Sequence, residues 1–123
     1  MDDRPRDIVE RTFPFALAIV RACKACERRN GTARTLARQL LRAAPSVGAN
    51  VEEAQAGQSR ADFISKYAIA LKEARETRYW LRLLMESGDC PDESSAALCL
   101  EAEELKRMIA AIIVKAKQNA APK

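Results

Sequence analysis

Apolar residues recur every three or four positions along four long segments of the chain, which is the spacing of an amphipathic helix. The clearest segment, residues 59–87, contains no proline or glycine, and its apolar stripe consists of Phe63, Tyr67, Ala70, Ala74, Thr77, Leu81 and Leu84. We predict a helix there, about 40 Å long at a rise of about 1.5 Å per residue. It opens with Ser59-Arg60-Ala61-Asp62, which has the spacing of a capping box.

Three further helices are predicted over about residues 5–29, 32–56 and 91–119, with Thr32 as the cap of the second. A proline inside a helix removes one backbone hydrogen bond and clashes with the preceding turn. We therefore expect a kink or a break at Pro14, and either one kinked helix or two shorter helices around Pro45. Because the connections are short, consecutive helices must run antiparallel. The prediction is a single all-α domain over residues 1–123, an antiparallel up-down-up-down four-helix bundle.

The amino-acid composition excludes several classes of protein function. The 123 residues contain no histidine, which excludes the common catalytic triads, histidine general bases, and zinc or di-iron sites that need imidazole. Aromatic residues make up 5% of the chain, too few for a base-stacking platform of the RNA-recognition type. We therefore expect a protein without enzymatic activity and without a cofactor.

The net charge of +4 is concentrated in the first third of the chain, where residues 1–44 carry 10 basic and 5 acidic side chains. Helical spacing groups seven of these cations into two stripes: Arg21, Lys24 and Arg28 with Arg29 beside them, and Arg34, Arg38 and Arg42. Neighbouring antiparallel helices would merge the stripes into one basic surface. Arginine suits phosphate, so we predict contact with a nucleic-acid backbone without reading of bases. The alternative is a solvated face with intermolecular salt bridges.

A second polar group lies on the middle two helices: Asn50, Glu52 and Glu53, and Lys72, Glu73, Arg75, Glu76 and Arg78. Paired carboxylates can serve acid–base chemistry or bind a metal, but ferritin-like sites also need histidine. We interpret five of these residues as a structural network of salt bridges that fixes the register of helices or subunits: Asn50, Glu53, Lys72, Glu73 and Glu76. Within it, Lys72 and Glu76 have the spacing of an i,i+4 ion pair.

The four cysteines are Cys23, Cys26, Cys90 and Cys99. The start of the chain is too charged for a signal peptide, and the longest apolar stretch, residues 13–20, is too short to span a bilayer. We therefore expect reduced thiols in a cytoplasmic protein. A four-thiolate zinc site is the alternative, because Cys23 and Cys26 form a C-x-x-C motif. The eight residues between Cys90 and Cys99 disfavour it.

Residues 39–84 resemble a known protein family. The run QLLRAAPSVGANVEEAQAGQSRADFISKYAIALKEARETRYWLRLL is similar to bacterial four-helix-bundle proteins encoded in intervening sequences of large-subunit ribosomal RNA genes. The resemblance rests on QLLR, SVGAN, EEA, DFISK, ALKEARET and YWLRLL, and it extends more weakly to FALAIV and LEAEELKRMIAAI. Pro45 departs from the family pattern at a position where a helix former is expected.

This resemblance implies an antiparallel bundle that assembles into a ring, commonly a homopentamer. It also extends to a related protein, the accessory variability protein of diversity-generating retroelements. That relative is a basic pentamer that binds a reverse transcriptase and nucleic acid. The family pattern contains no catalytic residues to transfer to this chain.

The sequence leaves three functional hypotheses open. The first is a homo-oligomeric scaffold whose basic surface binds RNA, DNA or a nucleic-acid enzyme such as a reverse transcriptase. The second is a protein–protein adaptor whose arginines only solubilise it. The third is a thiol-based metal or redox protein.

Tyr79 and Trp80 are adjacent on one helix and must face different directions. One is expected in the core and the other in a subunit interface.

Overall fold

The described residues of the computed structural model form four long helices and no strand. The structure describes residues 4–29, 31–88 and 93–120, and the side chains of residues 7–29, 31–88 and 95–119. The helices are α1 (Arg4–Glu27), α2 (Thr32–Gln55), α3 (Arg60–Ser87) and α4 (Glu93–Ala120). The predicted all-α fold class is confirmed. The predicted start of the last helix at residue 91 lies outside the described residues.

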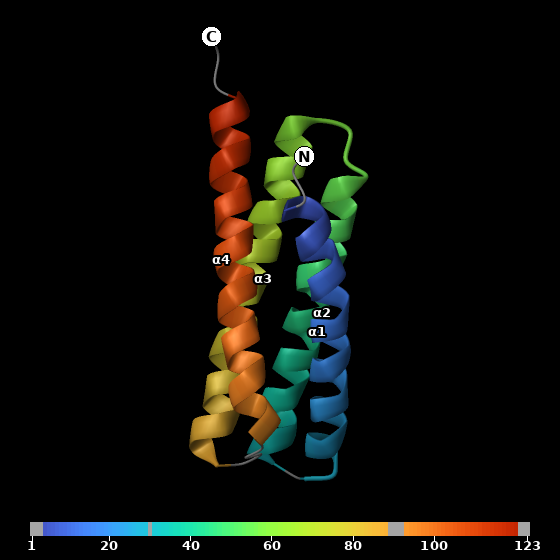
Figure 1. The fold of residues 1–123 in the computed structure, drawn as a ribbon. Coiled ribbons are helices and arrows are strands. Elements are labelled where there is room, and N and C mark those ends of the chain that lie inside the picture. The colour runs from blue at the N-terminus through green and yellow to red at the C-terminus, as the bar shows by residue number, and fades with distance from the viewer. Residues whose placement is uncertain (1–3, 30, 89–92, 121–123) are drawn as a thin grey trace.

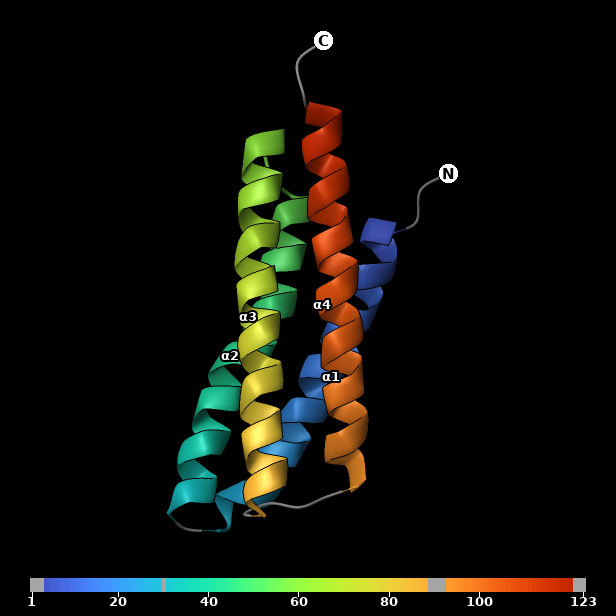
Figure 2. The same ribbon diagram turned by 90° about the vertical axis from the view of Figure 1, so that its left-hand side faces the viewer.

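The four helices pack side by side as an up-down-up-down bundle. In Figure 1, α1 and α3 run downward, and α2 and α4 run upward. Among the described residues each helix packs against its two neighbours in chain order, α4 also packs against α1, and no diagonal pair comes as close. Figure 2 shows the same arrangement from the side. The α1–α2 connection therefore lies at the lower end, and the α2–α3 connection lies at the upper end.

Both internal prolines are accommodated without a break in their helices. Pro14 and Glu10 are both exposed, so water can bond the Glu10 carbonyl oxygen that loses its partner in the helix. Pro45 leaves the carbonyl of Leu41 without its partner, and Leu41 is likewise exposed. The break considered at Pro14 and the two-helix alternative at Pro45 were therefore wrong.

The helix ends show one capping prediction to be right and one to be wrong. The Asp62 backbone N–H donates a hydrogen bond of 3.1 Å to Ser59 Oγ, as the capping-box spacing predicts. Thr32 does not cap α2, because Gly31 occupies that position with a φ of 64° and Thr32 is the first helical residue. Glycine adopts this left-handed φ without strain, which allows a tight turn after α1. Gly88, with a φ of 78°, ends α3 in the same way.

The core receives side chains from all four helices, and its largest fully buried aliphatic and aromatic members are Ile8, Ile19, Leu40, Val47, Val51, Tyr67, Leu81, Leu105 and Ile109. The stripe predicted on α3 faces this core. Tyr79 is 56% exposed and Trp80 packs against the core, as predicted for one of the two, but their rings meet edge to face with centroids 5.4 Å apart. No helix in the described part of the chain is both long and apolar enough to cross a membrane.

Candidate nucleic-acid interface

The cations predicted on the first two helices lie at the same height of the bundle. The Cys23 thiol donates a hydrogen bond of 3.4 Å to the Ala37 carbonyl oxygen, so these two positions of α1 and α2 lie side by side. The cations flank this contact on both helices: Arg21 and Lys24 on α1, and Arg34 and Arg38 on α2. The fold therefore brings the two stripes together at the lower end of the molecule.

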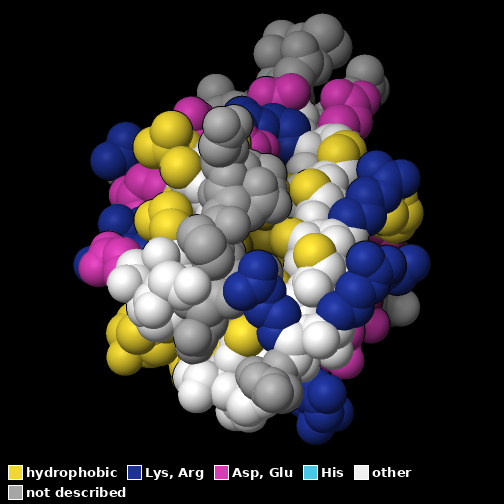
Figure 3. Space-filling view, turned by 90° about the horizontal axis from the view of Figure 1, so that it is seen from below, with side chains coloured by type: hydrophobic (Ala, Val, Ile, Leu, Met, Phe, Trp, Pro, Cys, Tyr) yellow, Lys and Arg dark blue, Asp and Glu magenta, His cyan; other side chains and the backbone are white. Residues whose placement is uncertain are grey.

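Five exposed side chains at this end form what we call the basic patch: Arg21, Lys24, Arg28, Arg34 and Arg38. None of the five makes an ion pair with another described residue. Arg29 is also exposed at this end but has a contact of its own, so we leave it out of the patch. Seen from below, Lys and Arg side chains gather on the side where α1 and α2 lie, whereas on the opposite side they alternate with Asp and Glu (Figure 3).

Arg42, the third predicted member of the α2 stripe, is held between α2 and α3. Its guanidinium pairs with Glu76 and, at 3.5 Å, with Glu73. Glu73 is only 7% exposed, and a carboxylate in that position is costly unless a cation accompanies it. Arg42 therefore neutralises an acidic pair at the edge of the α2–α3 interface, and we do not include it in the basic patch.

The residues of the predicted polar network do not form one network in the structure, because they contact different partners. Glu53 pairs with Lys66 at 3.0 Å across α2 and α3, and this contact raises the pKa of Lys66. Asn50 stays within its own helix, because its Nδ2 donates to the Ser46 carbonyl oxygen at 2.8 Å. Lys72 is exposed and makes no ion pair with a described residue. The predicted Lys72–Glu76 pair is wrong, because Glu76 reaches across to α2 instead.

Two further ion pairs join neighbouring helices, and the sequence pattern did not identify them. Arg11 binds Glu101 through two contacts of 2.7 and 3.1 Å across α1 and α4, and this carboxylate raises the pKa of Arg11. Arg78 pairs with Glu103 at 3.1 Å across α3 and α4. Pairs on different helices share no spacing in the chain, so no sequence signal points to them.

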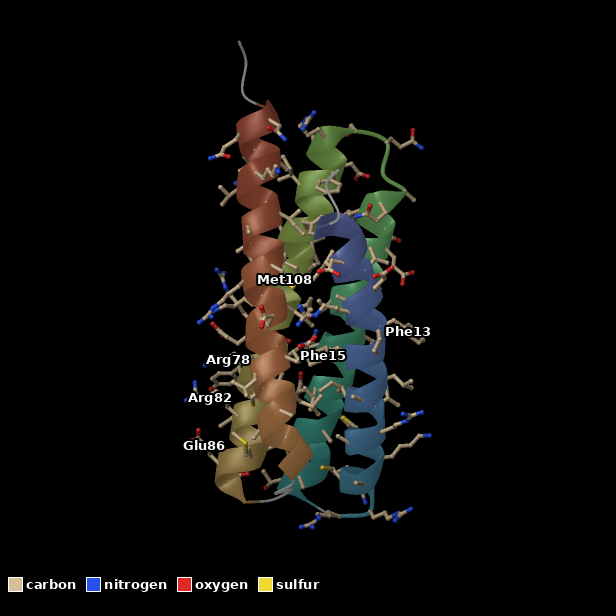
Figure 4. All side chains as sticks on the ribbon, in the orientation of Figure 1. Phe13, Phe15, Arg78, Arg82, Glu86 and Met108 are labelled. Carbon is tan, nitrogen blue, oxygen red and sulfur yellow. The ribbon has the colours of Figure 1, made fainter. Side chains whose placement is uncertain are left out.

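The opposite side of the bundle from the basic patch carries balanced charges. Figure 4 shows Arg78, Arg82 and Glu86 projecting together from α3. Arg82 lies 3.8 Å from Glu86, its i+4 neighbour on the same helix. Cations here have acidic partners close by, unlike those of the basic patch. The two sides therefore differ in how far their cations are paired with acidic side chains.

An apolar area adjoins the basic patch on the same two helices. Phe13 is 65% exposed and points away from the bundle, whereas Phe15 points inward (Figure 4). Leu17 on α1 and Leu41 on α2 are each 38% exposed. The surface formed by α1 and α2 is therefore cationic toward the lower end and partly apolar above it.

The described cysteines differ in oxidation state. Cys23 and Cys99 are free thiols, whereas Cys26 is disulfide-bonded, and Cys90 lies outside the described residues. The expectation of four reduced thiols was therefore wrong for Cys26, because spacing along one helix does not show which thiols the fold brings together. Burial raises the pKa of Cys23 to about 11, which keeps that thiol protonated and unreactive. Within the described residues, no group of three or more cysteine or acidic side chains is placed to hold a metal ion.

Comparison with known proteins agrees with the fold. The model of the 23S rRNA-intervening sequence protein family matches residues 5–111. A crystal structure of a protein of unknown function from the S23 ribosomal protein family of Bacteroides thetaiotaomicron is 36% identical to this chain, with a TM-score of 0.80. The match covers 89% of this chain and 97% of that one. No curated protein matches significantly.

These matches confirm the family suggested by the motifs of residues 39–84. The family model extends from α1 into α4, so it includes both helices of the basic patch as well as the central motifs. The chain belongs to the 23S rRNA-intervening sequence protein family.

Proposed function

We propose that the protein is a non-enzymatic, homo-oligomeric helical bundle that binds nucleic acid through the basic patch of α1 and α2. The observation that supports this function best is the gathering of five exposed cations, without ion-pair partners among the described residues, at one end of two packed helices. Four of the five are arginines, whose planar guanidinium groups bind phosphate oxygens through two parallel hydrogen bonds.

The patch is suited to a phosphate backbone. Arg34 and Arg38 are one turn apart on α2, so they are spaced about 6 Å along the helix axis. Binding of phosphates there would release condensed counterions and would be strong at low salt. Among the described residues, no paired amide groups or stacked aromatic rings accompany these cations to read bases. The proposed binding is therefore independent of sequence.

Self-association would strengthen this binding. Large apolar side chains are exposed on every helix, among them Phe13, Tyr79, Leu100 and Val114. Exposed apolar groups of this number are typical of surfaces that meet another protein. We propose that copies of the chain assemble into a closed ring of five subunits, which is the assembly that the family resemblance implies. In a ring, several patches bind one strand and their affinities reinforce each other.

A second candidate function is that of a protein–protein adaptor. The exposed Phe13, Leu17 and Leu41 beside the basic patch favour it, because apolar groups contribute little to binding a phosphate backbone. In that case the partner is another protein that binds the apolar area, and the arginines of the basic patch only solubilise the bundle. The two candidates differ in whether the purified protein binds nucleic acid by itself.

Fluorescence anisotropy with labelled random-sequence single-stranded RNA and duplex DNA distinguishes the nucleic-acid function from the adaptor function. We expect binding at about 50 mM salt that weakens by orders of magnitude toward about 200 mM, with no preference among sequences. If the protein binds neither nucleic acid at the lower salt concentration, the nucleic-acid function is refuted and the adaptor function is favoured.

A further inference from the structure

The upper end of the bundle is open on one side. In Figure 1, α3 and α4 extend above the first turn of α1. A cavity of about 470 Å³ lies there between the end of α2, the start of α3 and the end of α4, and no described residue of α1 lines it. We call it the end cavity. Its volume falls within the range of about 300–1,000 Å³ that is usual for pockets that bind small molecules.

The floor of the end cavity is apolar and well supported. Phe63 and Ile112 line it together with small alanine side chains. The Phe63 ring packs on the buried ring of Tyr67 with a centroid distance of 4.6 Å. The Tyr67 hydroxyl in turn accepts a hydrogen bond of 2.8 Å from Gln55 Nε2, and Gln55 also lines the cavity. An apolar body placed on this floor would meet a fixed surface.

The α2–α3 connection closes one wall of the cavity. A Cβ atom on Gly57 would lie 2.7 Å from Asp62 Oδ2 and 3.1 Å from the Ala54 carbonyl oxygen, so the connection passes close to the first turn of α3. Gln58 and Ser59 of the same connection face the cavity. The wall is therefore held by packing against α3 as well as by the Ser59 cap.

The described charged side chains that line the end cavity are all cationic. Arg60 at the start of α3 and Lys115 near the end of α4 line it, with the amide of Asn119 beside them, and no described acidic side chain is among its lining residues. Arg60 makes no ion pair with a described residue, whereas Lys115 has a contact of its own and would exchange it for the ligand. Cations next to an apolar floor select a ligand that combines an anionic group with an apolar body.

We propose that the end cavity binds a small organic anion, with its carboxylate or phosphate held by Arg60 and Lys115 and its apolar body on Phe63 and Ile112. This site is independent of the proposed nucleic-acid function, because the basic patch lies at the opposite end of the bundle.

The probe is anilinonaphthalene sulfonate, an aromatic anion that fluoresces when it enters an apolar site. At about 100 mM salt, which screens non-specific attraction, we expect saturable binding of one dye per chain. Arg60→Gln and Lys115→Gln should each weaken binding by about tenfold, since each removes a charge-assisted hydrogen bond. Lys117→Gln removes the same charge from an exposed neighbour that does not line the cavity, so it should leave binding unchanged.

Competition identifies the anion. Displacement of the dye by octanoate indicates a carboxylate ligand, and displacement by adenosine monophosphate indicates a phosphate ester. Far-UV circular dichroism of each variant shows whether the fold is retained, which is expected because both side chains are exposed. The proposal is overturned if the dye does not bind saturably, if Lys117→Gln weakens binding as much as Lys115→Gln, or if neither competitor displaces the dye.

Discussion

Small side chains determine how closely the helices approach. A Cβ atom on Gly48 would lie 3.2 Å from both Cβ and Oγ1 of Thr12, where α2 packs against α1. Thr12 is 1% exposed and β-branched, so its side chain has little freedom to move away. The same close packing recurs on α3, where Ala74 is 2% exposed in the middle of the bundle.

Replacing Ala74 with a large residue should therefore overpack the core. We predict that Ala74→Trp lowers the free energy of unfolding by roughly 1–3 kcal/mol or more, measured by urea denaturation. The matched control is Ala68→Trp, which adds the same side chain to an exposed position of the same helix and should change stability little. An equal loss in the two variants would show that the core-facing stripe of α3 is misassigned.

At the scale of the helices, ion pairs between neighbouring helices fix their register. Arg42 links α2 to the acidic pair on α3, and Glu103 of α4 binds Arg78 of α3 at 3.1 Å. Glu103 also contacts Lys106 and Arg107 on its own helix at 3.1 Å each. Arg42, Arg78, Lys106 and Arg107 are therefore occupied by acidic partners, unlike the cations of the basic patch.

The Glu103 cluster should make stability depend on acid pH. The Lys106 ammonium lowers the pKa of Glu103 below its ordinary value of 4.5. Because the folded-state pKa is below the unfolded one, the stabilisation is complete above pH 4.5 and is lost as the pH falls through the folded-state value. We predict that Glu103→Gln makes the melting temperature fall less between neutral and acid pH. Parallel melting curves for wild type and variant would contradict this.

The helices could be predicted because their signals are local. Apolar spacing identified four helices, and Ser59 marked the start of α3 through a hydrogen bond three residues away. The local signal failed where solvent or backbone geometry decided the outcome. Glu10, whose carbonyl Pro14 leaves unpaired in the helix, is exposed to solvent, and Gly31 adopts a left-handed conformation that displaces Thr32 as the cap.

The basic patch was only partly predictable from the sequence, because its membership depends on how the helices pack together. Helical spacing placed Arg34, Arg38 and Arg42 on one stripe, but each i,i+4 step rotates the side chain by about 40° around the helix. That drift turns Arg42 toward the carboxylates of α3, which only the packing of two helices reveals. The disulfide of Cys26 depends on tertiary contacts in the same way.

At the scale of the whole molecule, exposed apolar groups point to assembly. Among the residues whose side chains the structure describes, eight large apolar ones distributed over the four helices are more than about one-third exposed: Phe13, Leu17, Leu41, Ile69, Tyr79, Leu83, Leu100 and Val114. We predict that light scattering at low micromolar concentration gives a multiple of 13.6 kDa, the mass of one chain. A clean monomer would refute the proposed ring.

The central claim is that the basic patch binds phosphates, and a pair of charge-matched variants tests it. The first replaces three patch residues with glutamine: Lys24, Arg34 and Arg38. The control replaces three exposed cations outside the patch that also make no ion pair with a described residue: Lys72, Arg75 and Lys117. Both variants lose the same net charge, and both should stay folded because every replaced side chain is exposed.

The measurement is the slope of log affinity against log salt concentration for random-sequence RNA and duplex DNA. For each phosphate that a protomer no longer binds, the slope should become shallower by about 0.7 on single strands and about 0.9 on duplex. We predict that the patch variant loses most of its affinity and salt dependence on every sequence, whereas the control retains both. Equal behaviour of the two variants would show that net charge, and not the basic patch, accounts for binding.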